Sequence, residues 1–100
     1  MARFDFIAVY MLANRRNGTL YTGSTADLIA RMEQHKAGKG SVFTAKYGCD
    51  RLVWFERHEE MRPALDRERR IKSWPRRWKI DLIESENPDW DDLFWSMTPF

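Results

Sequence analysis

The segment that most constrains the fold of this chain is an apolar run that a polar turn separates from a second, shorter run. Residues 4–12 are almost entirely apolar and include β-branched and aromatic side chains, a composition typical of a central strand. The polar stretch that follows ends in Asn17-Gly18, and Asn-Gly is a strong signal for a hairpin turn. Residues 19–23 have the composition of the returning strand. These signals predict an antiparallel hairpin.

The rest of the chain carries helix boundaries and one more β-branched run. Capping residues, glycines and prolines mark the boundaries. They predict a helix opened by a capping box at Ser24 and Asp27 and ending near Ala37, a strand over 51–57, a helix over 63–73 and a helix from Pro75 to about Ile83. The order β-β-α-β-α-α predicts an α/β (α+β) domain in which helices pack on a small, mainly antiparallel sheet. The aromatic residues of the tail predict a short helix or strap folded onto this body.

Length and composition restrict the class of protein. One hundred residues, 43% of them hydrophobic and 32% charged, predict one globular domain. The single cysteine, Cys49, has no internal disulfide partner, which favours a reducing cytoplasm and a buried structural thiol. No run approaches the roughly twenty apolar residues of a membrane span, and the N-terminus lacks the features of a signal peptide. We therefore expect a cytoplasmic protein that does not associate with membranes.

The charge is distributed unevenly along the second half of the chain. Residues 62–79 contain eight basic residues and two acids, and residues 80–100 contain six acids and neither Lys nor Arg. The basic block suits a polyanion such as nucleic acid, and the acidic tail suits docking onto that block or plain solvation. If the tail covers the block, removing residues 87–100 is expected to tighten nucleic-acid binding. A salt-bridged surface explains the same asymmetry, so charge alone does not decide.

Three polar residues recur on one side of the first predicted helix. Asp27, Arg31 and His35 are spaced by four residues and share a face. One interpretation is a solvated stripe with one ion pair. The other is that Arg31 holds a phosphate, which its guanidinium fork matches, and that His35 helps to move a proton.

A carboxylate lies among apolar positions of the second predicted helix. Leu65, Glu68 and Ile71 are spaced by three residues, so Glu68 falls in the stripe expected to face the core. One interpretation is a buried salt bridge to a local arginine, namely Arg31, Arg67 or Arg69. The other is a ligand for Mg²⁺ or Mn²⁺, which often takes one or two protein carboxylates. No second acid lies at ligand spacing on this face, which disfavours a two-metal site.

Two tyrosines lie on the predicted neighbouring strands. Tyr10 and Tyr21 are explained either by ordinary packing of aromatic residues in a sheet or by a site, which Gly23 favours because a glycine permits close approach. Trp74 and Trp78, spaced by four residues, are expected in the core or alternatively as a stacking surface. The chain contains no Walker A loop, dinucleotide fingerprint, Cys/His zinc spacing or Gly-x-Ser-x-Gly motif.

Taken together, these residues resemble the GIY-YIG endonuclease superfamily. The resemblance is greatest to its small single-domain bacterial members, which are similar to the amino-terminal nuclease module of a bacterial excinuclease. Residues 8–10 (Ala-Val-Tyr) stand where the family has Gly-Ile-Tyr, and residues 21–23 (Tyr-Thr-Gly) stand where it has Tyr-Ile-Gly. Arg31, His35 and Glu68 match the helix arginine, a histidine of many members and the metal-binding glutamate.

The resemblance implies a fold and a role for each site residue. The implied fold is a three-stranded antiparallel sheet flanked by helices, with the site on one face of the sheet. Glu68 would bind one divalent metal, Mg²⁺ or Mn²⁺, and Tyr10, aided by His35, would accept a proton from the attacking water. Tyr21 would position that water or a phosphate oxygen, and Arg31 would offset the negative charge that develops on the oxygens of the phosphorane. The departures at residues 8 and 22 remove no side chain with an assigned role.

The resemblance covers about residues 6–83. It implies a nuclease domain over residues 1–84 and an acidic aromatic extension, residues 85–100, packed on it. Gly23 is expected to be structural. Contacts with nucleic acid are expected from basic residues of the glycine-rich loop and of the basic block, namely Lys39, Arg69, Arg70, Lys72 and Arg76.

These observations favour one function over two alternatives. The leading hypothesis is a metal-dependent DNA endonuclease that is selective for structure and linked to repair or recombination, with RNA not excluded and a protein partner possible for targeting. The second is a nucleic-acid-binding module without catalysis. The third is a protein-interaction adaptor whose acidic aromatic tail makes the contact. Glu68 in an apolar stripe favours catalysis, because binding alone does not need it.

Overall fold

The computed structural model describes residues 6–97 and confirms the predicted three-stranded antiparallel sheet flanked by helices. The strands β1 (Ile7–Ala13), β2 (Leu20–Thr25) and β3 (Arg51–His58) lie in the order β2-β1-β3. The central strand β1 forms the hairpin with β2, and its Tyr10 lies opposite Gly23 of β2 and Phe55 of β3.

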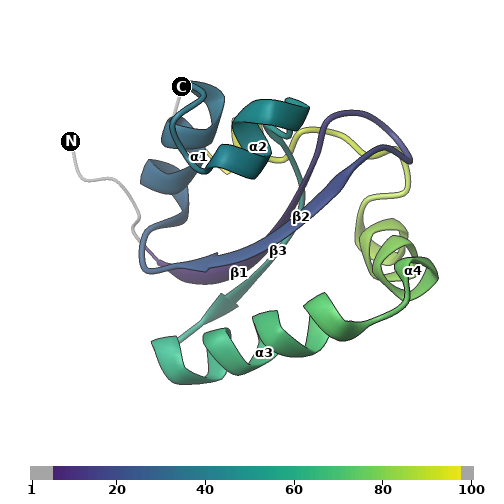
Figure 1. The fold of residues 1–100 in the computed structure, drawn as a ribbon. Coiled ribbons are helices and arrows are strands. Elements are labelled where there is room, and N and C mark those ends of the chain that lie inside the picture. The colour runs from purple at the N-terminus through teal and green to yellow at the C-terminus, as the bar shows by residue number, and fades with distance from the viewer. Residues whose placement is uncertain (1–5, 98–100) are drawn as a thin grey trace.

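Helices cover both faces of this sheet (Figure 1). The helices α1 (Leu28–Lys36) and α2 (Val42–Tyr47) lie on one face, and α3 (Met61–Ser73) and α4 (Arg76–Glu86) lie on the other. A single turn, α5 (Phe94–Met97), follows. Within residues 6–97, none of the helices combines the length and apolar character that a membrane crossing requires.

The predicted order of elements omitted α2. This helix has six residues, too few for a periodic pattern to stand out. Its boundaries are nevertheless marked in the sequence. The hydroxyl of Ser41 accepts a hydrogen bond from the backbone N–H of Thr44, and Gly48 ends the helix in the left-handed conformation with φ of 66°.

The predicted start of α1 was wrong. Ser24 belongs to β2, where it pairs with Val9, and the N-cap of α1 is Asp27, whose Oδ1 accepts a hydrogen bond from Ala30 N at 3.1 Å. The predicted capping box placed Asp27 inside the helix, whereas Asp27 is itself the N-cap. The strand pairing with β1 keeps Ser24 extended, so the helix begins after Asp27.

One hydrophobic cluster lies on each face of the sheet. One is formed with α1 and contains Tyr10 and Phe94, and the other is formed with α3 and α4 and contains Ile71 and Trp90. Trp90 and Phe94 belong to the tail, so the tail contributes to both clusters. The predicted division between residues 84 and 85 falls inside α4, and as a statement about domains it stays a prediction.

The described part of the tail does not cover the basic block. Asp92 forms an ion pair with Lys36 of α1 at 2.5 Å, whereas the side chains of Arg69 and Lys72 on α3 are 80% and 52% exposed. The tail is held by Trp90 in the cluster beneath α4, and by Phe94 and this ion pair on the α1 side of the sheet. The hypothesis of a tail that shields the block is therefore wrong for residues through Met97.

Two apolar residues lie outside the core in which they were expected. Trp78 is 56% exposed, and its ring meets the edge of Trp74 with centroids 6.0 Å apart. Their spacing of four crosses the break at Pro75 between α3 and α4, so helical periodicity does not place them on one face. Leu65 is 42% exposed, because two steps of three residues rotate it about 120° around α3 from the buried Ile71.

Candidate active site

The two tyrosines lie against a glycine. The ring of Tyr10 is 1% exposed, and its centroid is 6.3 Å from that of Tyr21 on the neighbouring strand. A Cβ atom at Gly23 would lie 2.7 Å from Tyr10 Oη and 3.1 Å from Tyr21 Cε2, closer than side chains pack. Both rings therefore use the space that a side chain at position 23 would fill.

His35 joins the tyrosines from α1. It is 3% exposed, its Nε2 lies 3.0 Å from Tyr10 Oη, and its Nδ1 lies 3.0 Å from Thr44 Oγ1. The interpretation of a solvated stripe is thus wrong for this residue. Two steps of four residues rotate His35 about 80° around the helix from Asp27, close to the direction of the buried Leu28.

Two residues that hold His35 were not predicted from the sequence. Thr44 of α2 is 3% exposed and fixes the far side of the ring. Gly40 provides space, because a Cβ atom there would lie 2.0 Å from His35 Nδ1. The sequence pattern indicated only a glycine-rich basic loop at residues 38–41. Ser41 was the available signal, since serine is a favoured N-cap residue.

Arg31 completes a directed chain of hydrogen bonds. Its Nε lies 3.4 Å from Tyr10 Oη, and its Nη1 donates to Gln34 Oε1 at 3.0 Å. Because arginine only donates, Tyr10 Oη accepts from Arg31, and its own proton is free to point at His35 Nε2. His35 then carries its proton on Nδ1 and donates it to Thr44 Oγ1. This assignment gives each of the four groups a donor or acceptor that it needs.

Burial controls the protonation of this chain. It raises the pKa of Tyr10 to about 12, although the hydrogen bond from Arg31 lowers that pKa. It also lowers the pKa of His35 to about 4, with a smaller contribution from the charge of Arg31. At neutral pH, Tyr10 is therefore a protonated phenol and His35 is a neutral imidazole with a lone pair on Nε2.

Glu68 reaches the site from α3. Its carboxylate accepts a hydrogen bond from the hydroxyl of Ser24 and lies 2.5 Å from Lys72 Nζ, and its side chain is 16% exposed. The interpretation in which Glu68 forms a salt bridge with a local arginine was wrong. The nearest ionic partner is the lysine one turn further along α3, while Arg67 is 3.1 Å from Glu56 of β3.

The site is divided by the edge strand β2. Gly23 and Ser24 are successive residues and face opposite sides of the sheet. Tyr10 contacts the first and Glu68 the second, and the charge of Glu68 contributes to the raised pKa of Tyr10. The expectation of a site on one sheet face is thus corrected, because the carboxylate comes from one layer of helices and the imidazole from the other.

The donor set bears on which metal these residues fit. Among residues 6–97, no three side chains of His, Cys, Asp or Glu lie together as a ready cage. A zinc site is therefore not supported. A single carboxylate is compatible with Mg²⁺ or Mn²⁺, which take oxygen ligands and complete their coordination with water.

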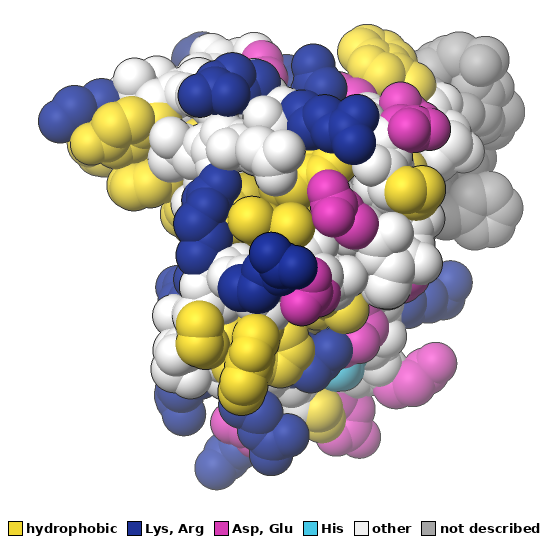
Figure 2. Space-filling view, turned by 90° about the vertical axis from the view of Figure 1, so that its right-hand side faces the viewer, with side chains coloured by type: hydrophobic (Ala, Val, Ile, Leu, Met, Phe, Trp, Pro, Cys, Tyr) yellow, Lys and Arg dark blue, Asp and Glu magenta, His cyan; other side chains and the backbone are white. Residues whose placement is uncertain are grey.

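The predicted nucleic-acid contacts lie outside this cluster. Lys39, Arg69 and Arg70 are exposed, and Lys72 lies beside Glu68. Arg76 instead donates to the carbonyls of the hairpin turn, at 2.6 Å to Gly18 O, and so ties α4 to the hairpin. Figure 2 shows Lys and Arg side chains spread over the side of the molecule that carries α4, with hydrophobic side chains between them.

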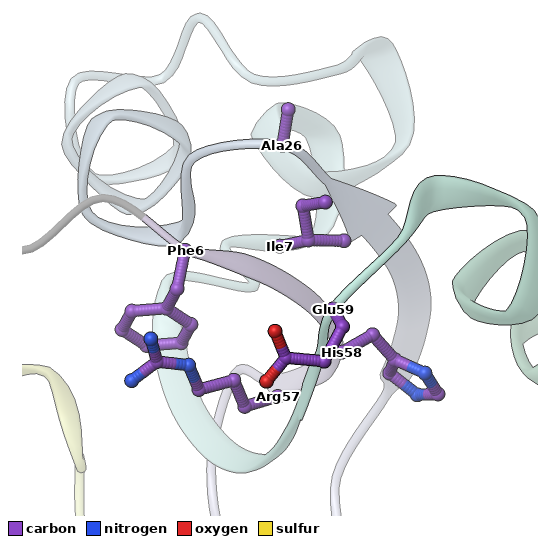
Figure 3. Close-up of a pocket in the computed structure, with 6 residues that line it drawn as sticks. All are labelled: Phe6, Ile7, Ala26, Arg57, His58 and Glu59. Carbon is purple, nitrogen blue, oxygen red and sulfur yellow. The ribbon is translucent and has the colours of Figure 1, made fainter.

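A separate hollow of about 200 Å³ lies where β1 begins and β3 ends (Figure 3). Arg57 lies over the ring of Phe6 there, with Cζ 5.2 Å from the ring centroid. The lining residues are Phe6, Ile7, Ala26, Arg57, His58 and Glu59. None of them is a predicted site residue.

Comparison with known proteins identifies the class of protein to which this fold and this site belong. The profile of the GIY-YIG catalytic domain matches residues 6–81, and the chain belongs to this family. UPF0213 proteins from Staphylococcus aureus strains Mu3 and COL are 40% identical over 68 residues, which are 68% of this chain and 83% of theirs. The solution NMR structure of a UPF0213 protein from Bacillus halodurans matches with a TM-score of 0.54 and 30% identity, over 86% of this chain and 90% of that one.

Proposed function

We propose that the protein is a metal-dependent endonuclease that hydrolyses phosphodiester bonds in nucleic acid. DNA of particular structure, in repair or recombination, is the proposed substrate. The observation that carries the proposal is the buried hydrogen bond of 3.0 Å between Tyr10 and His35, with Glu68 on the other side of β2. Membership of a family of catalytic domains supports it.

The hydrogen-bond chain supports a route for the proton. A phenol with a pKa of about 12 holds its proton and cannot by itself act as a base. Tyr10 can accept a proton from the attacking water if it passes its own to His35 Nε2 in the same step. The water oxygen then forms a bond to phosphorus, and the bond from phosphorus to the leaving oxygen breaks. The negative charge of bound phosphate favours the imidazolium that results.

The remaining site residues supply charge and position. Arg31 is partly exposed beside Tyr10 and can donate to phosphate oxygens. Tyr21 lies beside the same ring and is proposed to orient the water or a phosphate oxygen. Glu68 would hold Mg²⁺ or Mn²⁺, which when bound neutralises charge on the phosphate and the leaving oxygen. Lys72 balances Glu68 in the free protein and can turn to a phosphate.

The proposal is tested with Glu68→Gln, which keeps an acceptor for Ser24 and removes the charge. Wild type and variant are incubated with labelled single-stranded, duplex, nicked, flapped and four-way-junction DNA, with Mg²⁺, Mn²⁺ or EDTA. We expect metal-dependent cleavage by the wild type and a loss of at least about a hundredfold in the variant.

The matched control is Asp66→Asn, which removes the same charge from an exposed position on the same helix. It should cleave like the wild type. Equal residual activity in the wild type and Glu68→Gln would mean a contaminant and would contradict the proposal. Salt-sensitive binding without cleavage would instead favour the non-catalytic module, or a nuclease that needs a protein partner for targeting.

Two further points concern setting and alternatives. The free thiol of Cys49 is buried, and burial raises its pKa, which supports the proposal of a reducing, cytoplasmic compartment. The adaptor hypothesis loses support, because Trp90 is fully buried and Phe94 is 6% exposed. Of the aromatic side chains expected to make that contact, Trp95 is the exposed one among the described residues.

A further inference from the structure

The helix α2 exposes a cluster of apolar side chains. Val42 is 87% exposed, Phe43 is 41% exposed and Tyr47 is 44% exposed. The exposed parts of these two rings contribute no hydrophobic stabilisation to a helix of only six residues. The buried member of this helix is Thr44, which contacts His35. One side of α2 therefore supports the candidate site while the other presents aromatic rings to solvent.

These rings continue those of the site. The ring of Tyr21 is 5.7 Å from that of His35 and 5.9 Å from that of Phe43, and Phe43 is 4.7 Å from Tyr47, all between centroids. The planes of Tyr21 and Phe43 differ by 31°. An unbroken series of rings thus leads from the buried imidazole to the surface, and a group that stacks on Phe43 lies next to Tyr21.

The surroundings of the rings are positively charged. Residues 37–48 contain two lysines, Lys39 and Lys46, and no acid. Lys46 Nζ lies 5.4 Å from the ring centroid of Tyr47, and Lys39 is exposed in the loop before the helix. A shallow hollow of about 460 Å³ lined by Lys39 and Val42 adjoins the start of α2. Aromatic rings interleaved with lysines are complementary to the bases and phosphates of a single strand.

We propose that Phe43 and Tyr47 form a stacking surface for an unpaired base adjacent to the scissile phosphate. In a duplex both faces of each base are already covered by neighbouring bases, so only an unpaired or frayed base offers a free face to these rings. The preferred substrate is therefore nucleic acid with a single-stranded segment beside the cleaved bond. This inference rests on the proposed nuclease function and names the feature by which that site selects its substrate.

A second exposed aromatic group competes for this role. Trp74 and Trp78 lie on the opposite side of the sheet, and Arg67 is placed over the Trp74 ring at 5.3 Å. Neither tryptophan is in ring contact with Tyr21 or His35. We therefore assign base stacking to α2, and we use Trp78, which is more exposed than Phe43, as the matched control.

The test measures binding by full-length Glu68→Gln protein, so that cleavage does not interfere. The probes are a fluorescent single-stranded oligonucleotide and the same sequence as a blunt duplex. Phe43→Leu keeps the apolar volume and removes the ring. We expect it to weaken single-strand binding by roughly tenfold and duplex binding by less than about twofold, while Trp78→Leu leaves both within about twofold. Phe43→Trp should keep the preference.

The outcomes separate this inference from the proposed function. Equal weakening of single-strand and duplex binding by Phe43→Leu, or a preference that moves only with Trp78→Leu, would overturn the stacking surface. Thermal unfolding of each variant checks that the fold is kept. If the wild type cleaves no substrate, the non-catalytic module or a nuclease that needs a protein partner is favoured and this binding result still stands, whereas normal cleavage with an unchanged preference would contradict only the stacking surface.

Discussion

At the scale of single residues, the properties of His35 come from its neighbours. Its ring lies in the space left by Gly40 and is held by Tyr10 at one nitrogen and Thr44 at the other. The same enclosure that orients the imidazole removes it from water and disfavours its charged form. A histidine with both nitrogens engaged and no charge is a ready acceptor for one proton from Tyr10.

This environment predicts a dependence of stability on pH. The pKa of His35 falls from 6.5 to about 4 on folding, so the unfolded chain binds more protons between these values. The free energy of unfolding should therefore fall as the pH is lowered from 6.5 towards 4, by up to about 1.4 kcal/mol per pH unit. Urea denaturation at pH 7, 6 and 5 measures this. His35→Gln should lose this part of the slope, and parallel curves for the two proteins would contradict the prediction.

Some of the site was predictable from the sequence and some was not. Tyr10, Tyr21, Arg31, His35 and Glu68 have unusual side chains for their positions, or stand in a recognisable order. The structure brings the first four together and places the fifth across β2. The partners Ser24, Gly40 and Thr44 are ordinary residues of a strand, a loop and a short helix. Their importance comes from contacts that only the folded chain makes.

At the scale of elements, the edge strand β2 lies between the two halves of the site. Gly23 borders Tyr10 on one side, and Ser24 donates to Glu68 on the other. Because side chains alternate along a strand, no single residue of β2 faces both halves of the site. Two successive residues, Gly23 and Ser24, therefore contact Tyr10 and Glu68 respectively. The geometry of the site therefore depends on the register of β2 against β1.

We predict that Gly23→Ala impairs cleavage more than folding. The added Cβ would lie 2.7 Å from Tyr10 Oη and displace the hydroxyl from His35, at a cost of about 1–3 kcal/mol for overpacking. We expect cleavage to fall at least about tenfold, because the proton route is interrupted. Gel assays of cleavage and thermal unfolding measure the two effects.

The control for this prediction is Gly38→Ala. Gly38 has φ of 76° and open space around it, so alanine costs about 1–2 kcal/mol in backbone strain without touching the site. This variant should be less stable and still cleave. If both variants lose activity in proportion to stability, the specific role of Gly23 is refuted.

The elements themselves were predictable where their signals were local. The hairpin follows from an apolar run and Asn17-Gly18, and α3 follows from Pro63 in its first turn and the break at Trp74-Pro75. The signals failed where a choice depended on distant pairing, as at Ser24, or where one pattern spanned a break, as at Pro75. The short α2 is stabilised by its capping residues and by the contact between Thr44 and His35. A periodic pattern of hydrophobic residues does not reveal such interactions.

At the scale of the whole molecule, the tail holds the two layers of helices to the sheet. Trp90 completes the cluster beneath α4, and its Nε1 donates to Glu84 at 2.8 Å. Phe94 joins the cluster beneath α1, beside the ion pair of Asp92 and Lys36. A tail that fills both clusters is part of the core, which is why its removal cannot simply expose the basic block.

We predict that Trp90→Ala costs about 3–5 kcal/mol of unfolding free energy, a large share of the roughly 5–15 kcal/mol of a typical domain. Removing residues 87–100 should prevent stable folding instead of tightening nucleic-acid binding. Urea denaturation followed by circular dichroism measures both. Trp95→Ala, at a position that is 63% exposed, should change stability by less than about 1 kcal/mol. A truncated chain that unfolds cooperatively at the wild-type midpoint would disprove the prediction.

The division of the site by β2 has a consequence for how the protein is made. The phenol, guanidinium and imidazole groups belong to the first half of the chain and the carboxylate to α3, so a nascent polypeptide emerging from the ribosome carries one half of the site before the other exists. The halves meet only when α3 docks on the sheet. The proposed cutting activity is therefore expected only from copies of the chain in which α3 has docked on the sheet.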